Sequence, residues 1–441
     1  MIDRIQQQKT RLNQIGPGFC LAKFYDVSMH LETGRDHSCV HPRARQVPVE
    51  EIQASYHALH NSQGKKDVRQ QMLEGQRPSE CGYCWRMEDA GPDILSDRSW
   101  YSARWNDEFF NKILNNGANH NYFPTHLEIS FSIICNFKCV YCGPQVSSQW
   151  LKDLKNNGPY GHKIWSIEAM TADGEMPIDD EDSNPYIKAF WEWLPEAYPH
   201  LRTLRVTGGE PLLSPNTYRV LNWAIENKNL NLEIGINTNL GVPDLLIDRL
   251  TDRLKQLIRA RTVRSVKVYT SGEGCGSQFE YMRMGSDYSQ WKRNIIKILD
   301  ASPEISVEIM TTYNALSVQG YMNFLVDINQ IQKTYGHRLH VDTHMHLQFP
   351  RHLSIDILTA DFLEPVQQQI EFLKQTQNTL GVHRADRLLK YFKSALDNPS
   401  ESLQVQRHTF YNFILEYDAR SGTNFYQTFP DMQEFFETCR P

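Results

Sequence analysis

The sequence predicts an α/β protein built around a parallel sheet, and two patterns carry this prediction. Between residues 126 and 348, short runs rich in β-branched and aromatic residues alternate with longer stretches of helical periodicity. This alternation is typical of βαβ units. Several of the strand-like runs also end in glycine or in polar side chains. Because active sites of such folds lie at the carboxyl ends of the strands, we expect a functional site at that edge of the sheet.

Six strands are expected in this region, with helices between them. The strands are Leu127–Ser132, Thr203–Thr207, Leu232–Asn237, Ser265–Thr270, Ser306–Thr311 and Leu339–His344. The helices are Thr217–Asn227, Asp244–Arg259, Gln290–Leu299 and Gly320–Tyr335. Residues 1 to about 100 carry scattered Gly, Pro, His and Cys, and we expect them to be irregular. Past residue 350 three further helices are predicted, Asp361–Gln375, Arg384–Leu396 and Leu403–Tyr417, which would cover the open side of the sheet.

Composition and charge are those of an ordinary globular protein. The chain has 441 residues, of which 40% are hydrophobic and 22% charged, and this length suits two or three domains. The net charge is −6 and no basic tract appears, so the charge of the chain does not favour binding of a nucleic-acid substrate. No run of about 18 apolar residues indicates a membrane span, and the N-terminus lacks an apolar signal core. Seven of the nine cysteines fall into two groups, which favours a reducing, cytoplasmic location.

Three of these cysteines follow the first strand in a short segment with CxxxCxxC spacing, Cys135, Cys139 and Cys142. Three thiolates on one loop can hold a cubane iron–sulfur cluster by three of its four irons. The fourth iron then has no protein ligand, and an open coordination position is typical of a reactive metal site rather than a structural one. A zinc site completed by a distant ligand, or a chance group of thiols in a reduced protein, remains the alternative.

The CxxxCxxC spacing, with the aromatic Tyr141 between the last two cysteines, resembles the signature of the radical SAM superfamily. The resemblance implies a partial, six-stranded TIM barrel, here over residues 120–352, and a 4Fe–4S cluster that binds S-adenosylmethionine (SAM) at its open iron. In this family one electron from the cluster splits SAM into methionine and a 5′-deoxyadenosyl radical, which abstracts hydrogen from a substrate. The resemblance also implies an external electron donor such as a flavodoxin or a ferredoxin.

A Gly-Gly-Glu-Pro sequence follows the second expected strand. Glycine lets the backbone of Gly208 and Gly209 approach a ligand closely, and the carboxylate of Glu210 can accept a charge-assisted hydrogen bond from an ammonium group. These residues resemble the GGE motif of the family, which holds the amino group of the SAM methionine. An ordinary turn between strand and loop is the alternative.

Weaker matches end the next two strands. The resemblance implies that Asn237 and Ser271 contact the ribose and carboxylate of SAM, and that Arg283 pairs with a carboxylate. Polar loops are the alternative, because Asn and Ser also favour strand ends for turn chemistry. Cys275 follows the same strand end as Ser271 and is a candidate catalytic hydrogen-atom donor, with a buried bystander as the alternative.

A second group of cysteines precedes the expected sheet. It comprises Cys20, Cys39, Cys81 and Cys84, with Gly34 between the first two. Their order resembles the front half of the SPASM signature, the twitch version, which binds an auxiliary 4Fe–4S cluster. In the better-known families this module follows the barrel, whereas here it would occupy residues 1–105 and precede it.

Four cysteines would saturate the auxiliary cluster, so an electron-transfer or structural role is expected rather than substrate binding. A structural four-cysteine zinc site is the alternative. His30, His37 and His41 lie nearby and are interpreted as loop histidines, because four cysteines already suffice.

These observations together predict a cysteine-rich domain, a barrel and a C-terminal helical extension over residues 353–441. The function they favour is a radical SAM enzyme of the oxidoreductase type, acting on a peptide or a small molecule, with an auxiliary cluster for electron transfer. One alternative is a non-catalytic binding or scaffold protein stabilised by zinc at both cysteine groups. The other keeps the SAM cluster and uses it to transfer a methyl or aminocarboxypropyl group.

Overall fold

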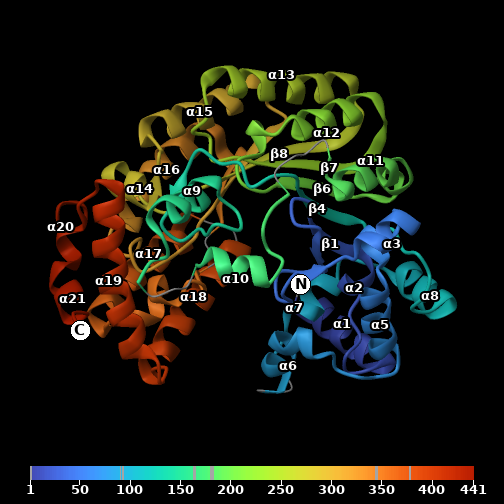
Figure 1. Ribbon diagram of the computed structural model, residues 1–441, viewed down its shortest axis with the longest axis horizontal. Helices are drawn as coiled ribbons and strands as arrows, with labels where there is room; N and C mark the ends of the chain where they lie inside the picture. Colours follow the sequence, from blue (N-terminus) through green and yellow to red (C-terminus); the bar gives the residue numbers. More distant parts are fainter. Residues whose placement is uncertain are drawn as a thin grey trace.

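A nine-stranded sheet forms the centre of the computed structural model, in the order β11-β10-β8-β7-β6-β4-β1-β2-β3. The structure describes residues 2–89, 91, 94–161, 165–178, 183–342, 346–376 and 379–441. Figure 1 shows the helices α11, α12, α13 and α15 as an outer layer above this sheet, with the N-terminal region and the C-terminal helices on opposite sides below it. None of the described helices combines the length and apolar character that a membrane crossing needs.

The expected strands and helices of the central region are present, which confirms the α/β prediction. The strands are β4 (His126–Ser130), β6 (Thr203–Thr207), β7 (Asn229–Asn237), β8 (Val263–Ser271), β10 (Ile305–Met310) and β11 (Leu339–Asp342). Every neighbouring pair among them is parallel. The expected helices are α12 (Pro215–Glu226), α13 (Asp244–Ala260), α15 (Tyr288–Ala301) and α16 (Tyr321–Tyr335), and α11 (Pro185–Ala197) is a further helix that was not predicted. The last two residues of the strand predicted over Leu339–His344 lie outside the described residues.

The central region supplies six parallel strands to this sheet, and the N-terminal region adds three more that were not predicted. Strand β1 (Asp26–His30) pairs in parallel with β4, and β2 (Arg35–His37) and β3 (Arg45–Gln46) follow in antiparallel pairing. In β1 buried apolar residues alternate with polar ones, and so short a polar run gives little strand signal. His30 and His37 therefore lie in strands, and their interpretation as loop histidines is wrong.

The expectation that residues 1 to about 100 are irregular is also wrong. This region contains α1 (Ile2–Ile15), α5 (Gln63–Leu73), α6 (Gly82–Asp89) and α7 (Asp97–Ser102), and α8 (Asp107–Asn116) follows it. A hydrophobic cluster separate from that of the sheet holds α1, α5, α7 and α8 together. Within it the ring of Tyr25 makes edge contacts with Phe109 and Tyr122, at centroid distances of 4.8 and 5.7 Å.

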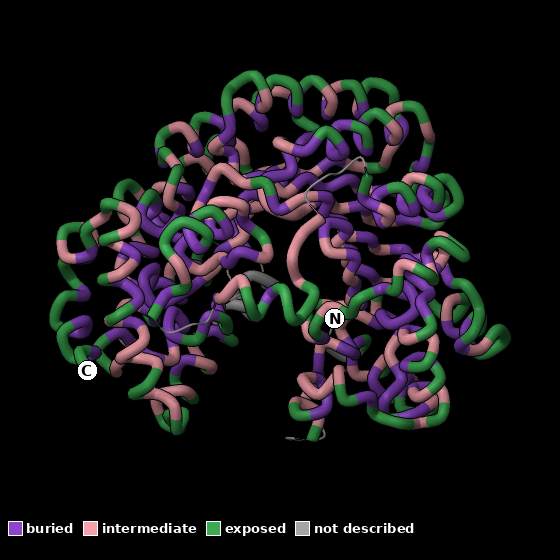
Figure 2. Tube along the Cα trace, viewed as in Figure 1, coloured by how far each residue is buried: buried purple, intermediate pink, exposed green. Residues whose placement is uncertain are grey.

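The two faces of the sheet differ in polarity, as the period of two along each strand requires. Leu204, Val206, Ile234 and Ile236 are almost completely buried and belong to the same hydrophobic cluster as Leu250 of α13. Figure 2 shows this pattern as buried strands beneath helices whose outer turns are exposed. The outer helices are thus held by one apolar face of the sheet.

The opposite face carries charged and aromatic side chains in register. Arg205 of β6 lies 3.6 Å from Glu128 of β4, and its guanidinium group stacks 4.1 Å over the ring of Tyr269 of β8. The Lys267 ammonium lies 3.1 Å from a carboxylate oxygen of Glu308 on β10. The strands that form this face carry the motif residues at their carboxyl ends.

The three predicted C-terminal helices are confirmed as α17 (Leu363–Thr376), α18 (Thr379–Asp397) and α19 (Leu403–Ser421). The last of them contacts the segment that carries the CxxxCxxC cysteines. The hydroxyl of Tyr417 donates to the backbone carbonyl of Lys138 at 3.0 Å, and Phe413 stacks against Trp150. The C-terminal helices therefore support the loop after β4.

Candidate functional site

The cysteine loop, residues 135–142, follows β4 and is held by hydrogen bonds at its start and in its middle. The Ser148 hydroxyl accepts from the backbone N–H of Cys135 and donates to its carbonyl, at 3.1 and 3.2 Å. The indole N–H of Trp150 donates to the carbonyl of Cys139 at 2.8 Å. In the middle, β5 (Lys138–Cys139) pairs with β9 (Arg283–Met284). Since its backbone is fixed in this way, the loop holds its three thiol groups in a defined arrangement.

The surroundings of the three thiol groups differ. Burial raises the pKa of Cys135 to about 12, although the backbone N–H of Phe137 donates to its sulfur at 3.4 Å. The hydrogen bond from Cys142 lowers the pKa of Cys139, and the Arg283 guanidinium adds to this effect. Because the thiolate is the form that binds metal, a cation and N–H donors next to the sulfurs favour ligation. Three cysteines in such a loop fit a cubane cluster with one open iron.

The GGE loop, residues 208–210, packs directly against the segment that leads into Cys135. The backbone N–H of Gly209 donates to the carbonyl of Ser132 at 3.0 Å, and that of Glu210 donates to Ile134 at 2.8 Å. A Cβ atom at Gly209 would lie 2.5 Å from the Ile134 oxygen, and Gly208 has a φ of 123°. Both positions therefore require glycine, for space at one and for backbone conformation at the other.

Glu210 is a buried carboxylate without a cationic partner. It is 2% exposed, and its two oxygens accept backbone N–H groups of Leu212 at 3.0 Å and Asn239 at 2.6 Å. No Lys, Arg or His of the described chain is close enough to influence its charge, and burial raises the pKa of Glu210 to about 7. Because a buried carboxylate is costly without a counter-charge, this site is suited to an ammonium group of a ligand.

A buried ion pair lies next to the cysteine loop. Arg283 donates from Nη2 to Glu273 Oε2 at 2.7 Å, and the hydroxyl of Tyr141 donates to the other carboxylate oxygen at 2.7 Å. Glu273 is 0% and Arg283 5% exposed. Arg283 thus pairs with a carboxylate of the protein. Glu273 was not predicted from the sequence, where its only signal is an acidic residue two positions after Ser271, beyond the end of β8.

The structure also identifies a residue that the sequence analysis did not single out at the end of β7. The predicted residue Asn237 accepts a hydrogen bond from Arg205 at 2.7 Å on the charged face of the sheet. Asn239 instead reaches the cysteine loop, where its side-chain N–H₂ group donates to Asn136 at 2.8 Å and lies 3.9 Å from the sulfur of Cys135. Asn239 therefore joins the GGE loop, through Glu210, to the first cysteine.

The two remaining predicted residues lie near β8. Ser271 is the last residue of this strand and is in register with Met310 of β10. Cys275 immediately precedes α14 (Gly276–Met282), and its charged neighbours are Asp327 and Lys292 on the outer helices α16 and α15. The contacts proposed for Ser271 with SAM, and a catalytic role for Cys275, stay predictions.

The four N-terminal cysteines lie in one neighbourhood. Cys20 is close enough to interact electrostatically with each of Cys39, Cys81 and Cys84, although the residues come from three different segments. Gly34, in the turn between β1 and β2, has a φ of 68°, and a Cβ atom there would lie 2.1 Å from the ring of Tyr186. The fold thus brings together the cysteines that the sequence placed in one group.

Hydrogen bonds and a buried cation surround these four thiol groups. Backbone N–H groups of Ala22, His41 and Arg98 hydrogen-bond to Cys20, Cys39 and Cys84, respectively. Burial raises the pKa of Cys81 to about 11, and the nearby ammonium of Lys23 opposes this shift. Such donors suit cysteines that act as metal ligands. Across the described residues of the whole chain, no three His, Cys, Asp or Glu side chains are arranged to hold a single metal ion.

A model of a known protein family matches the part of the chain that contains the central site. Residues 129–315 match the family model described as Radical SAM superfamily. This stretch includes the cysteine loop, the GGE loop, Glu273 and Arg283. The chain therefore contains a radical SAM superfamily domain, which implies a 4Fe–4S cluster, SAM and typically an external electron donor. The match does not extend to the four N-terminal cysteines, and no curated protein matches the chain.

Proposed function

We propose that this protein is a radical SAM enzyme in which Cys135, Cys139 and Cys142 hold the 4Fe–4S cluster. The bound cluster supplies the electron that cleaves SAM to a radical, which then removes hydrogen from a peptide or a small molecule. The observation that carries the proposal is the position of Glu210. Its buried carboxylate has no cation of the described residues beside it and is joined through Asn239 to the first cysteine.

Each residue of the site has a proposed part in holding SAM. Glu210 binds the ammonium group of the methionine moiety, and Gly208 and Gly209 keep the backbone close to it. Tyr141, Asn237, Ser271 and Arg283 are the further proposed contacts. Arg283 and Glu273 neutralise each other, so the pair fixes the wall of the site next to Cys139 and Cys142 without adding net charge.

We further infer that Cys20, Cys39, Cys81 and Cys84 hold an auxiliary 4Fe–4S cluster, and that the reaction is of the oxidoreductase type. The support is the gathering of four thiols, with N–H donors to three of them. Strand β1 joins this N-terminal region to the sheet beside β4, which leads into the cysteine loop. A second cluster in this position would exchange electrons with a substrate radical.

Anaerobic reconstitution tests this function. Protein reconstituted with iron and sulfide, then given dithionite and SAM, is expected to form 5′-deoxyadenosine and to contain about eight irons per chain, as two cubanes require. Replacing the four N-terminal cysteines by alanine should lower the iron content to about four and leave the other cluster in place. Zinc at both sites and no cleavage of SAM would contradict the proposal and favour the scaffold alternative.

The pKa of Glu210 leads to a prediction on pH. The ammonium of SAM binds the ionised carboxylate, so below a pKa of about 7 a proton must leave before SAM binds. The affinity for SAM is therefore expected to rise with pH up to this value, by at most about tenfold per unit, and then to level off. Calorimetric titration of the reconstituted protein with SAM at several pH values measures this.

The matched control for this prediction is Glu210→Gln, which keeps the shape of the side chain and removes its charge. We expect this variant to bind SAM about 10- to 100-fold more weakly above neutral pH, because a charge-assisted hydrogen bond is lost. Its affinity should not change between pH 6 and 8. A pH dependence that persists in Glu210→Gln would assign the titration to another group.

A further inference from the structure

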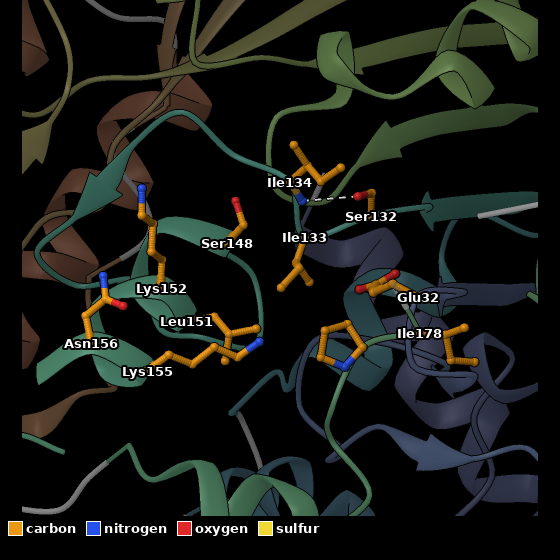
Figure 3. A pocket seen from close by; sticks show the side chains of 11 residues that line it. Glu32, Ser132, Ile133, Ile134, Ser148, Leu151, Lys152, Lys155, Asn156 and Ile178 are labelled. Carbon is orange, nitrogen blue, oxygen red and sulfur yellow. Dashed lines mark hydrogen bonds between the residues drawn. The ribbon is translucent and has the colours of Figure 1, made fainter. Parts of the chain in front are cut away.

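A cavity of about 330 Å³ lies beside the cysteine loop, and nothing in the proposed binding of SAM uses it (Figure 3). Its lining residues are Glu32, Ser132, Ile133, Ile134, Ser148, Leu151, Lys152, Lys155, Asn156, Pro177 and Ile178. Ile134 directly precedes Cys135, and Ser148 binds the backbone of Cys135. A molecule in this cavity would therefore lie next to the proposed cluster, and the volume suits a small ligand.

Glu32 forms part of one wall of the cavity, and its carboxylate group is largely buried. Glu32 is 3% exposed, and its Oε1 atom lies 3.6 Å from Nδ1 of His30, which in turn hydrogen-bonds His37 at 3.2 Å. The other oxygen, Oε2, is buried and accepts no hydrogen bond from any described residue. The backbone is fixed as well, since the N–H of Ile178 donates to the Glu32 carbonyl at 2.8 Å.

A buried acceptor without a donor costs free energy, and such atoms are rare in folded proteins. His30 lies 3.6 Å from the Glu32 carboxylate group, and this contact is an ion pair when the imidazole is protonated. A ligand ammonium group at this wall would lie next to the Glu32 carboxylate group and offset its charge. An ammonium group suits it best, because a charge-assisted hydrogen bond is stronger than a neutral one.

The opposite wall carries positive charge. Lys152 and Lys155 lie on α9 (Ser148–Asn157), both are exposed, and neither forms an ion pair within the described chain. Figure 3 shows both lysines extending from the side of the cavity away from Glu32, with the Lys155 nitrogen reaching toward the middle beside Leu151 and Ile133 and the Lys152 nitrogen directed away from it. The cavity therefore has a carboxylate group on one side, apolar side chains in its lining and the positive charge of Lys155 facing them.

We propose that this cavity binds the substrate, and that the substrate is an amino-acid-like zwitterion with its ammonium group on Glu32 and its carboxylate near Lys155 and Lys152. The inference rests on the proposed function, which supplies the reactive site beside the cavity. The methionine moiety of SAM carries the same two groups. The buried carboxylate of Glu210 provides a separate site for its ammonium.

Titration calorimetry of the reconstituted protein with three small probes tests the charge pattern. The probes are 6-aminohexanoate, which has both charges, and hexylamine and hexanoate, which have one each. We expect 6-aminohexanoate to bind at least about tenfold more tightly than either, because only it satisfies both walls. Equal affinity for the three probes, or no binding of 6-aminohexanoate, would overturn the proposal.

Two variants and a control assign the binding to these residues. Glu32→Gln keeps the shape of the side chain and should weaken the binding of 6-aminohexanoate about 10- to 100-fold. Lys155→Met should also weaken this binding. Lys333→Met, which removes an exposed lysine on α16 outside the cavity, should leave binding unchanged. Unchanged affinity in Glu32→Gln would contradict the assignment.

The same titrations separate this inference from the proposed function. If Glu32→Gln weakens the binding of SAM but not the binding of 6-aminohexanoate, the cavity is part of the SAM site and the substrate assignment is wrong. Wild-type protein that binds the probe through Glu32 but never forms 5′-deoxyadenosine would support the cavity and contradict the proposed reaction. Binding of the probe does not require turnover, so the two results are independent.

Discussion

Replacing Cys139 by alanine is expected to abolish the formation of 5′-deoxyadenosine. A cubane held by three thiolates has no spare protein ligand, so the loss of one leaves two irons without a cysteine. Cys139 is also the least replaceable of the three by position, because it is buried, hydrogen-bonded to Cys142 and part of the β5–β9 pairing. The reconstituted variant should contain about four fewer irons than the wild type, measured together with product formation.

The control for this experiment is Cys439→Ala. Cys439 is as buried as Cys139 but lies near the C-terminus, outside both cysteine groups. Its replacement removes a thiol without removing a proposed ligand, so iron content and product should stay at the wild-type level. A Cys139→Ala protein that keeps its full iron content and still cleaves SAM would show that the cluster is held elsewhere.

The sequence predicted the central sheet and the motif loops well because both signals are local. Alternation within strands such as Thr203–Thr207 depends on neighbouring residues, and this strand was placed without error. The spacing of Cys135, Cys139 and Cys142 is likewise contained in eight residues. Such patterns need no knowledge of the distant contacts of the chain.

What the sequence did not predict depends on pairing across long separations. Strand β1 becomes part of the sheet only because it pairs with β4. The paired residues are 100 positions apart in the sequence, as Asp26 and His126 show. Nothing in five residues with three polar side chains indicates such a partner. The N-terminal region was therefore interpreted as irregular, although β1 makes it continuous with the sheet.

The same limit applies to the site. Asn237 ends β7 and was singled out, whereas Asn239 two residues later makes the contacts with Glu210 and the cysteine loop. Glu273 was missed because its importance comes from Arg283 and Tyr141, which approach it from other segments. A residue whose role is set by a partner far along the chain gives no periodic or spacing signal of its own.

The pair of Glu273 and Arg283 is expected to have the largest effect on stability of any single contact at the site. Glu273→Gln leaves the charge of Arg283 buried and unpaired, and Arg283→Met does the same to Glu273. Each change should lower the free energy of unfolding by about 3–5 kcal/mol. The double variant should be more stable than the sum of the two losses predicts, because neither charge then remains buried alone.

Denaturant unfolding of the four proteins under anaerobic conditions measures this cycle, and an exposed pair provides the comparison. Lys297 and Asp248 lie 2.6 Å apart with side chains 38% and 53% exposed, so breaking their contact should cost at most about 1 kcal/mol. If the Glu273–Arg283 pair costs no more than this, its charges are not held away from water. In that case the pair would not fix the wall of the site beside Cys139, and the proposed rigid setting of the cysteine loop would depend on Ser148 and Trp150 alone.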